Sequence, residues 1–185
     1  MIQSAIPLLG FCAFSGTGKT TLLISVLPLL KNSGLRVTVI KHAHHNFDVD
    51  YPEKDSYKIR KSGAEQVMVI SRKRLAIIRE FEAEHEEPTL AEALDCLDHR
   101  EVDLILVEGF KKEAFPKIEL HRASLGHPLM CTDDPNIIAL ASDTKVPAVP
   151  RQLPSLDLNT PQTVVDFILE YAGISASFNQ PRQLM

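Results

Sequence analysis

The sequence predicts an α/β fold built around a mostly parallel β-sheet. An apolar run at residues 8–14 has the length of a buried strand; the glycine-rich residues 15–21 follow it, and leucine and valine then recur at helical spacing. A second apolar run, residues 104–107, follows Asp103 and leads into Glu108 and Gly109. These two observations predict a P-loop NTPase-like three-layer sandwich, to which residues 66–78 add a β-hairpin extension.

The bulk composition is that of a globular protein of 185 residues, with 44% hydrophobic and 24% charged residues. We expect a single P-loop NTPase domain at residues 1–173 and a flexible tail at 174–185, where no periodicity is visible. A net charge of −4 argues against a nucleic-acid partner. Every apolar run is far shorter than the roughly 20 residues of a membrane span, so we expect a cytoplasmic protein without a membrane partner.

Residues 15–21 have the composition of a phosphate-binding loop. Backbone N–H groups freed by Gly16 and Gly18 can converge on a phosphate at the positive end of the following helix. Lys19 can reach the outer phosphates as a catalytic cation, and the Thr20 hydroxyl can hold Mg²⁺. The pattern GxxxxGK[ST] has Ala13 at its first position here, and the alternative is a glycine-rich turn of chance composition. The predicted nucleotide-binding residues are Ser15, Gly16, Thr17, Gly18, Lys19, Thr20 and Thr21.

A second strand is predicted at residues 37–40, after a helix that ends before Gly34. Strand, helix and strand form a right-handed crossover between parallel strands, and ligands bind at the carboxyl ends of such strands. Lys41 and the segment after it should therefore face the nucleotide site.

This segment contains His42, His44 and His45, and we predict that it contacts a substrate or partner together with Lys41 and Asp50. The histidines could contact a phosphate or a pterin. They could also bind a transition metal, since imidazole is a common ligand of zinc and nickel, or have a structural role.

Three carboxylates of the same segment, Asp48, Asp50 and Asp55, could approach a magnesium ion held by Thr20, and Asp55 is our candidate ligand. The alternative is that they are solvated acids, with Asp55 as the N-cap of a helix at 56–62.

Two β-rich runs, residues 66–71 and 75–78, flank a basic turn at 72–74 and predict a hairpin. An acidic connector, residues 80–88, leads to a helix that we expect Thr89 to cap.

The strand at 103–107 resembles a Walker B strand. Buried parallel strands do not end in a carboxylate for stability, so we assign Glu108 to magnesium binding through water, or to orienting an attacking water, against the alternative of a surface acid.

The remaining predicted elements include the candidate residue for recognition of the nucleotide base. Residues 117–121 alternate like a half-exposed strand, and residues 136–141 form a buried strand that ends at Ser142 and Asp143. The Asp143 carboxylate can accept hydrogen bonds from N1–H and the N2 amine of guanine, although the residue could simply form a turn. Thr160 should cap a last helix that Pro161 starts and Gly173 ends.

Four segments together resemble the molybdopterin-guanine dinucleotide biosynthesis protein B (MobB) family: the phosphate loop at Gly16, residues 41–45, residues 54–56 and residues 107–111. The resemblance spans approximately residues 6–171. The histidine run and the EGFK tetrapeptide are its specific features, because a phosphate loop alone occurs in many unrelated proteins. Glu53 stands where the family usually has glycine.

The resemblance implies a GTP-binding accessory protein of bacterial molybdenum-cofactor maturation with weak GTPase activity, using GTP and Mg²⁺. It implies a MobA-type guanylyltransferase as partner, with molybdopterin or molybdoenzyme-specific chaperones as further candidates, and a homodimer.

Two other functions fit a P-loop NTPase. A metallochaperone-type GTPase would need His42, His44 or His45 to bind metal. A small-molecule kinase would need an acceptor pocket and an arginine-bearing lid, for which the sequence offers only Arg60 and residues 72–74.

Overall fold

The computed structural model describes residues 2, 4–43, 47–81, 87–146 and 151–174. The chain forms two compact units: residues 1–42 with 90–185, and residues 43–89. The predictions for the tail beyond residue 174 and for His44 and His45 lie outside the described residues. That residues 1–173 form one domain stays a prediction.

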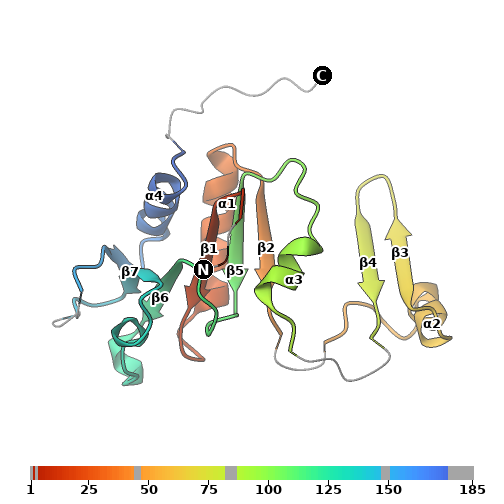
Figure 1. The fold of residues 1–185 in the computed structure, drawn as a ribbon, viewed down its shortest axis with the longest axis horizontal. Coiled ribbons are helices and arrows are strands. Elements are labelled where there is room, and N and C mark those ends of the chain that lie inside the picture. The colour runs from red at the N-terminus through yellow and green to blue at the C-terminus, as the bar shows by residue number, and fades with distance from the viewer. Residues whose placement is uncertain (1, 3, 44–46, 82–86, 147–150, 175–185) are drawn as a thin grey trace. The chain divides into compact units, whose positions relative to one another are not determined.

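A six-stranded, entirely parallel sheet is the centre of the first unit, in the order β2-β5-β1-β6-β7-β8. Figure 1 shows β1 between β5 and β6, with the arrowheads of the three strands at the same edge. The bounds are β1 Leu8–Cys12, β2 Val37–Lys41, β5 Leu104–Glu108, β6 Lys117–His121, β7 Ile137–Ser142 and β8 Ser155–Asp157. The parallel sheet is as predicted, except that β8 was missed.

Helices cover both faces of this sheet. On one face, α1 (Lys19–Asn32) and α4 (Pro161–Tyr171) pack on Leu9, Phe11 and Leu106. On the other face, Leu90 and Leu94 of α3 (Leu90–Asp95) join a core with Ile105 and Val107. The three-layer α/β fold is therefore confirmed. Two single-turn 3₁₀ helices, η1 (Ala123–Leu125) and η2 (Met130–Thr132), lie in the β6–β7 connection.

The second unit consists of α2 (Asp55–Lys61) and an antiparallel hairpin of β3 (Gln66–Ile70) and β4 (Leu75–Arg79). The predicted hairpin is confirmed. Arg60 is buried in this unit and bonds both oxygens of Asp48, at 2.7 and 2.9 Å, as well as Glu80. Arg60 thus links α2 to the segment that precedes the helix and to the residue that follows β4.

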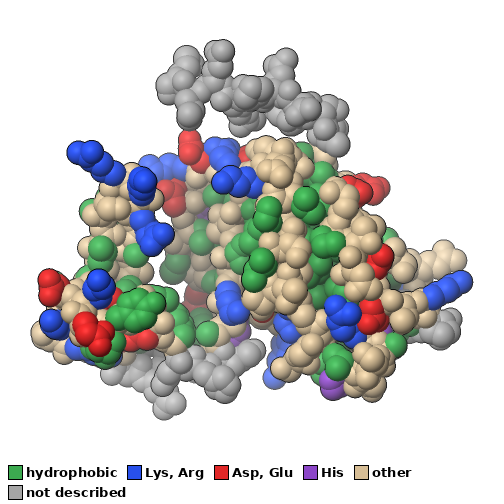
Figure 2. Space-filling view, turned by 180° about the vertical axis from the view of Figure 1, so that it is seen from behind, with side chains coloured by type: hydrophobic (Ala, Val, Ile, Leu, Met, Phe, Trp, Pro, Cys, Tyr) green, Lys and Arg blue, Asp and Glu red, His purple; other side chains and the backbone are tan. Residues whose placement is uncertain are grey.

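Four side chains share one face of the hairpin, because Met68 pairs with Ile77 and Ile70 pairs with Leu75. All four are more than half exposed. Figure 2 shows hydrophobic side chains at the surface of this unit. We call Met68, Ile70, Leu75 and Ile77 the hairpin face.

The prediction of a half-exposed strand at residues 117–121 is wrong, because β6 lies inside the sheet and its first four residues are buried. Lys117 is 1% exposed and pairs with Asp134 at 2.6 Å. Glu119, also 1% exposed, accepts hydrogen bonds from the backbone N–H of Met130 and Cys131. The charged residues in this alternating pattern are two buried side chains, Lys117 and Glu119, each of which has polar partners.

Helix starts also differ in detail. Asp55 is not an N-cap, because α2 begins at Asp55 and Lys54 occupies the cap position. Thr160 is at the N-cap of α4, but its hydroxyl donates to Asp157 instead of capping the helix. No helix in the described part of the chain is long and apolar enough to span a membrane.

Candidate functional site

The phosphate loop has the backbone that its sequence predicts. Gly16 has φ 78° and Gly18 has φ 101°, left-handed conformations that favour glycine. The Thr17 hydroxyl is buried and donates to the Phe14 carbonyl at 2.9 Å, which closes the loop. Ser15 and Thr21 are exposed at either end of it. Because α1 begins at Lys19, the unpaired N–H groups of its first turn lie at this loop, which suits an anion.

Lys19 folds back over the loop. Its ammonium donates to the carbonyls of Ala13 at 3.1 Å and Phe14 at 3.4 Å. Burial lowers the pKa of this ammonium below its ordinary value, while the nearby Glu108 carboxylate opposes that effect. A cation that is partly desolvated gains strongly from an anionic ligand.

The loop and the end of β5 meet at a chain of three polar groups. Thr20 Oγ1 donates to Glu108 Oε1 at 3.0 Å, and Lys41 Nζ donates to Glu108 Oε2 at 3.4 Å. The three residues come from α1, β5 and β2, and Lys41 and Glu108 are partners in the parallel register. A threonine hydroxyl beside a carboxylate is the oxygen donor set that suits Mg²⁺ at a P-loop, so the residues fit that ion.

After Glu108 the chain makes a strained turn against His42. Gly109 has φ 111°, and a Cβ there would lie 2.5 Å from the His42 Cβ. Phe110 follows with φ 49°, unusual for a bulky residue, and its ring stacks on the imidazole with centroids 4.3 Å apart. The ring of His42 therefore packs against the end of β5, which supports a structural role for it.

The acidic residues after His45 belong to the second unit. Hydrogen bonds from Arg60 hold the pKa of Asp48 below its ordinary value. Asp50 accepts from the backbone N–H of Tyr51, and Asp55 is 94% exposed and pairs with Lys58 at 3.8 Å. Within the described residues no group of three metal-ligating side chains gathers. The approach of Asp55 to Thr20 stays a prediction.

Sequence reasoning missed Arg122, the residue directly after β6. Its Nε donates to the carbonyl of Thr17 in the phosphate loop at 3.0 Å, and its Nη1 pairs with Asp143 Oδ2 at 3.1 Å. The available signal was its position, since it follows a strand at the same carboxyl edge as Glu108 and Asp143.

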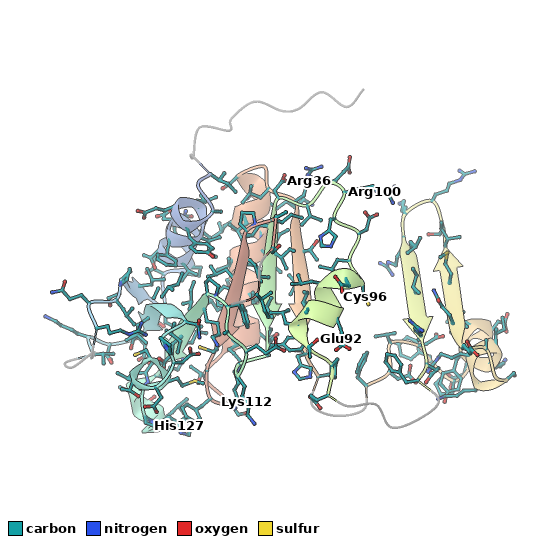
Figure 3. All side chains as sticks on the ribbon, in the orientation of Figure 1. Arg36, Glu92, Cys96, Arg100, Lys112 and His127 are labelled. Atoms are coloured by element: carbon teal, nitrogen blue, oxygen red, sulfur yellow. The ribbon has the colours of Figure 1, made fainter. Side chains whose placement is uncertain are left out.

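A pocket of about 430 Å³ opens beside the loop, where the Phe14 ring stacks on His127 with centroids 4.4 Å apart. Figure 3 shows Lys112 and His127 at the strand-end edge of the sheet, whereas Arg36 and Arg100 lie at the opposite edge. The pocket combines apolar surface with charges of both signs, from Phe14, Lys111, Lys112, Pro128, Leu129, Met130, Asp133 and Asp134.

Residues 8–143 match the model of the family "Molybdopterin guanine dinucleotide synthesis protein B". The chain belongs to the MobB family. The matched range includes the phosphate loop, Glu108, Arg122 and Asp143, so the site described above lies within the family's shared region.

Two curated relatives are similar to this chain over at least 90% of their length. The molybdopterin-guanine dinucleotide biosynthesis adapter protein of Escherichia coli is 46% identical, over 91% of this chain and 95% of its own. The adapter protein of Haemophilus influenzae is 40% identical, over 90% of both chains.

Solved MobB structures share the fold. A crystal structure of molybdopterin-guanine biosynthesis protein B superposes with a TM-score of 0.67 at 28% identity and covers 88% of this chain and 98% of its own. A crystal structure of Bacillus subtilis MobB gives 0.68 at 25% identity, over 90% of this chain and 98% of that one.

Proposed function

We propose that this protein is a GTP-binding adapter with weak GTPase activity in the biosynthesis of molybdopterin guanine dinucleotide. The hydrogen bond from Thr20 to Glu108 is the observation on which the nucleotide assignment rests. A carboxylate beside the threonine of a phosphate loop is the arrangement that nucleoside triphosphate and Mg²⁺ require, and this supports the assignment. Membership of the MobB family supports the pathway.

In this proposal Lys19 contacts the outer phosphates, and Thr20 and Glu108 hold Mg²⁺, which would neutralise phosphate charge when bound. Hydrolysis breaks the bond between the β and γ phosphates of GTP as water adds to the γ phosphorus, giving GDP and phosphate. Both Glu108 oxygens already accept hydrogen bonds, so the residue is better suited to orienting water than to deprotonating it. This supports a slow reaction.

The relatives' shared name, adapter protein, supports a function through binding a partner. We propose a MobA-type guanylyltransferase as that partner, with molybdopterin reached through the complex. The test is pull-down of purified guanylyltransferase by the tagged chain with GTP, with GDP and without nucleotide. Retention that depends on GTP, and is lost in Lys19→Ala, supports the proposal; no retention under any condition contradicts it.

We also propose a homodimer. The hairpin face exposes four apolar side chains on a two-stranded sheet, and a two-stranded sheet is marginally stable by itself. Burial against the same face of a second copy would remove this surface from water.

The pocket beside Phe14 favours one second candidate, a small-molecule kinase whose acceptor would lie next to the phosphates. Transfer of labelled γ-phosphate from GTP to a pterin or nucleoside would support it, whereas release as free phosphate only would contradict it. For the metallochaperone alternative, the stacking of His42 on Phe110 offers no support.

A further inference from the structure

The Arg122 guanidinium spans the distance between the phosphate loop and Asp143. Nε donates to the Thr17 carbonyl at 3.0 Å and Nη1 to Asp143 Oδ2 at 3.1 Å. Nη2 lies 4.0 Å from the position that a Cβ of Gly18 would occupy. The side chain is thus fixed at two points, one of which belongs to the loop that would hold the phosphates.

The two oxygens of Asp143 are in different situations. Oδ2 has the charged partner just described, whereas Oδ1 is buried and accepts no hydrogen bond from the residues that the structure describes. The Asp143 side chain is 18% exposed. A buried carboxylate oxygen without a donor is costly, so this atom is suited to a donor from a ligand.

The topology places this oxygen where a base would lie. His121 of β6 and Ser142 of β7 are partners in the parallel register. Arg122 directly follows His121 and Asp143 directly follows Ser142, so the two residues leave neighbouring strands at the same level of the sheet. Both stand at the carboxyl edge of the sheet, on the β6 side of the phosphate loop. In open parallel sheets a bound nucleotide extends along this edge from the phosphates to the base.

We propose that Arg122 determines the base selectivity of the site by engaging Asp143 Oδ2 in a charge-assisted hydrogen bond, which weakens this oxygen as an acceptor for a base and leaves Oδ1 as the main acceptor for the N1–H of a 6-oxopurine. The N1–H and N2–H bonds of guanine are parallel, and a carboxylate accepts both well only with both oxygens. Adenine has an acceptor at N1 and leaves Oδ1 unpaired. The ligands are therefore guanosine and inosine triphosphates alike, with ATP excluded.

This inference rests on the proposed nucleotide site, and its test separates the two. The experiment is a competition assay, in which GTP, ITP or ATP displaces a fluorescent GTP analogue from the full chain and the dissociation constant of each competitor is measured. For the wild type we expect GTP and ITP to bind equally within about twofold, and ATP to bind at least about tenfold more weakly. The Asp143→Asn variant should lose most of the discrimination against ATP, because a rotated amide can also donate to adenine N1.

Arg122→Ala frees Oδ2 to accept the N2 amine. The ratio of ITP to GTP dissociation constants should then rise by about tenfold, even though both nucleotides lose the attraction of the guanidinium. Arg36→Ala is the matched control, since Arg36 pairs with Asp103 at 2.9 Å at the opposite edge of the sheet and its removal should leave the ratio unchanged.

Two results overturn the role of Arg122 alone: a wild type that already prefers GTP to ITP tenfold, or a folded Arg122→Ala variant with an unchanged ratio. If Arg122→Ala does not fold, the affinities of the wild type for GTP and ITP alone test the role of Arg122. If no triphosphate binds the wild type, or Lys19→Ala binds normally, the nucleotide site fails as a whole and this inference with it.

Discussion

At the scale of single residues, Lys19 shows how a lysine can be placed for a ligand and yet contribute little to the fold. Its ammonium contacts two backbone carbonyls, and no described carboxylate lies within 4.0 Å of it. The carbonyl contacts are weak compared with what phosphate oxygens offer a cation.

Lys19→Ala should therefore weaken GTP binding by about 100-fold, the order of two charge-assisted hydrogen bonds, and leave the melting temperature nearly unchanged. Titration calorimetry and thermal unfolding measure both quantities. Lys31→Ala is the matched control, because Lys31 is an exposed lysine in the last turn of the same helix. Normal GTP affinity of Lys19→Ala would contradict the phosphate-loop assignment.

Glu108→Gln keeps the shape of the side chain and removes its charge. Hydrolysis should fall on the order of 10- to 100-fold while GTP still binds, because in the proposed function the carboxylate orients water and the loop holds the phosphates. Phosphate release under single-turnover conditions measures this. Glu101→Gln, a control at an exposed position near the start of β5, should have the wild-type rate. Equal rates in all three proteins would leave Glu108 with a structural role.

At the scale of elements, patterns that are local in sequence predicted structure well. The loop between β1 and α1 and the end of β5 were predicted because the residues that specify them are consecutive. The burial of β6 was not predicted, because the partners of Lys117 and Glu119 are Asp134 and backbone groups of the connections before and after the strand, and the sequence of β6 itself does not reveal them. The same reason hid Arg122, whose partners are 105 and 21 positions away in sequence.

The ion pair of the buried Lys117 with the partly exposed Asp134 gives a prediction about stability. Lys117 also donates to the carbonyls of Lys111 and Glu113, so Lys117→Met leaves those acceptors and Asp134 Oδ2 without the lysine donor, while Asp134 Oδ1 keeps its hydrogen bonds from Asn136. We expect a loss of about 3–5 kcal/mol in the free energy of unfolding, measured with urea. The double variant Lys117→Met with Asp134→Asn should recover part of the lost free energy of unfolding. Single and double variants of equal stability would contradict the pairing.

The same pair predicts a dependence on pH. Burial tends to raise the pKa of Asp134, but hydrogen bonds from Lys117 and Asn136 hold it below its ordinary value. A depressed folded pKa adds stability that is fully present above the unfolded pKa of about 3.9 and is lost as the pH falls through the folded pKa. Unfolding curves between about pH 5 and pH 2 should therefore differ less between wild type and Lys117→Met as the pH decreases.

At the scale of the whole molecule, the second unit exposes apolar surface that a small hairpin cannot bury by itself. If the hairpin face joins two copies, Met68→Lys with Ile77→Glu should give a monomer that still binds GTP. Opposite charges at this cross-strand pair preserve the hairpin. Light scattering with size-exclusion chromatography measures the mass. Ile24→Glu, on an exposed apolar residue of α1, should remain dimeric; a dimeric hairpin variant would contradict the interface.

The central position of β1 has a consequence for synthesis on the ribosome. Both neighbours of β1 are distant in the chain, and Cys12 and Ile118, which are in contact, are 106 positions apart. At about 5–20 residues per second, roughly 5–20 s pass between the appearance of the phosphate loop and of its second supporting strand. Nascent chains arrested at increasing lengths should gain protection from protease by GTP only after His121 has left the exit tunnel. We therefore expect the proposed nucleotide site to form only after β6 has been synthesised, although its phosphate loop is synthesised about 100 residues earlier.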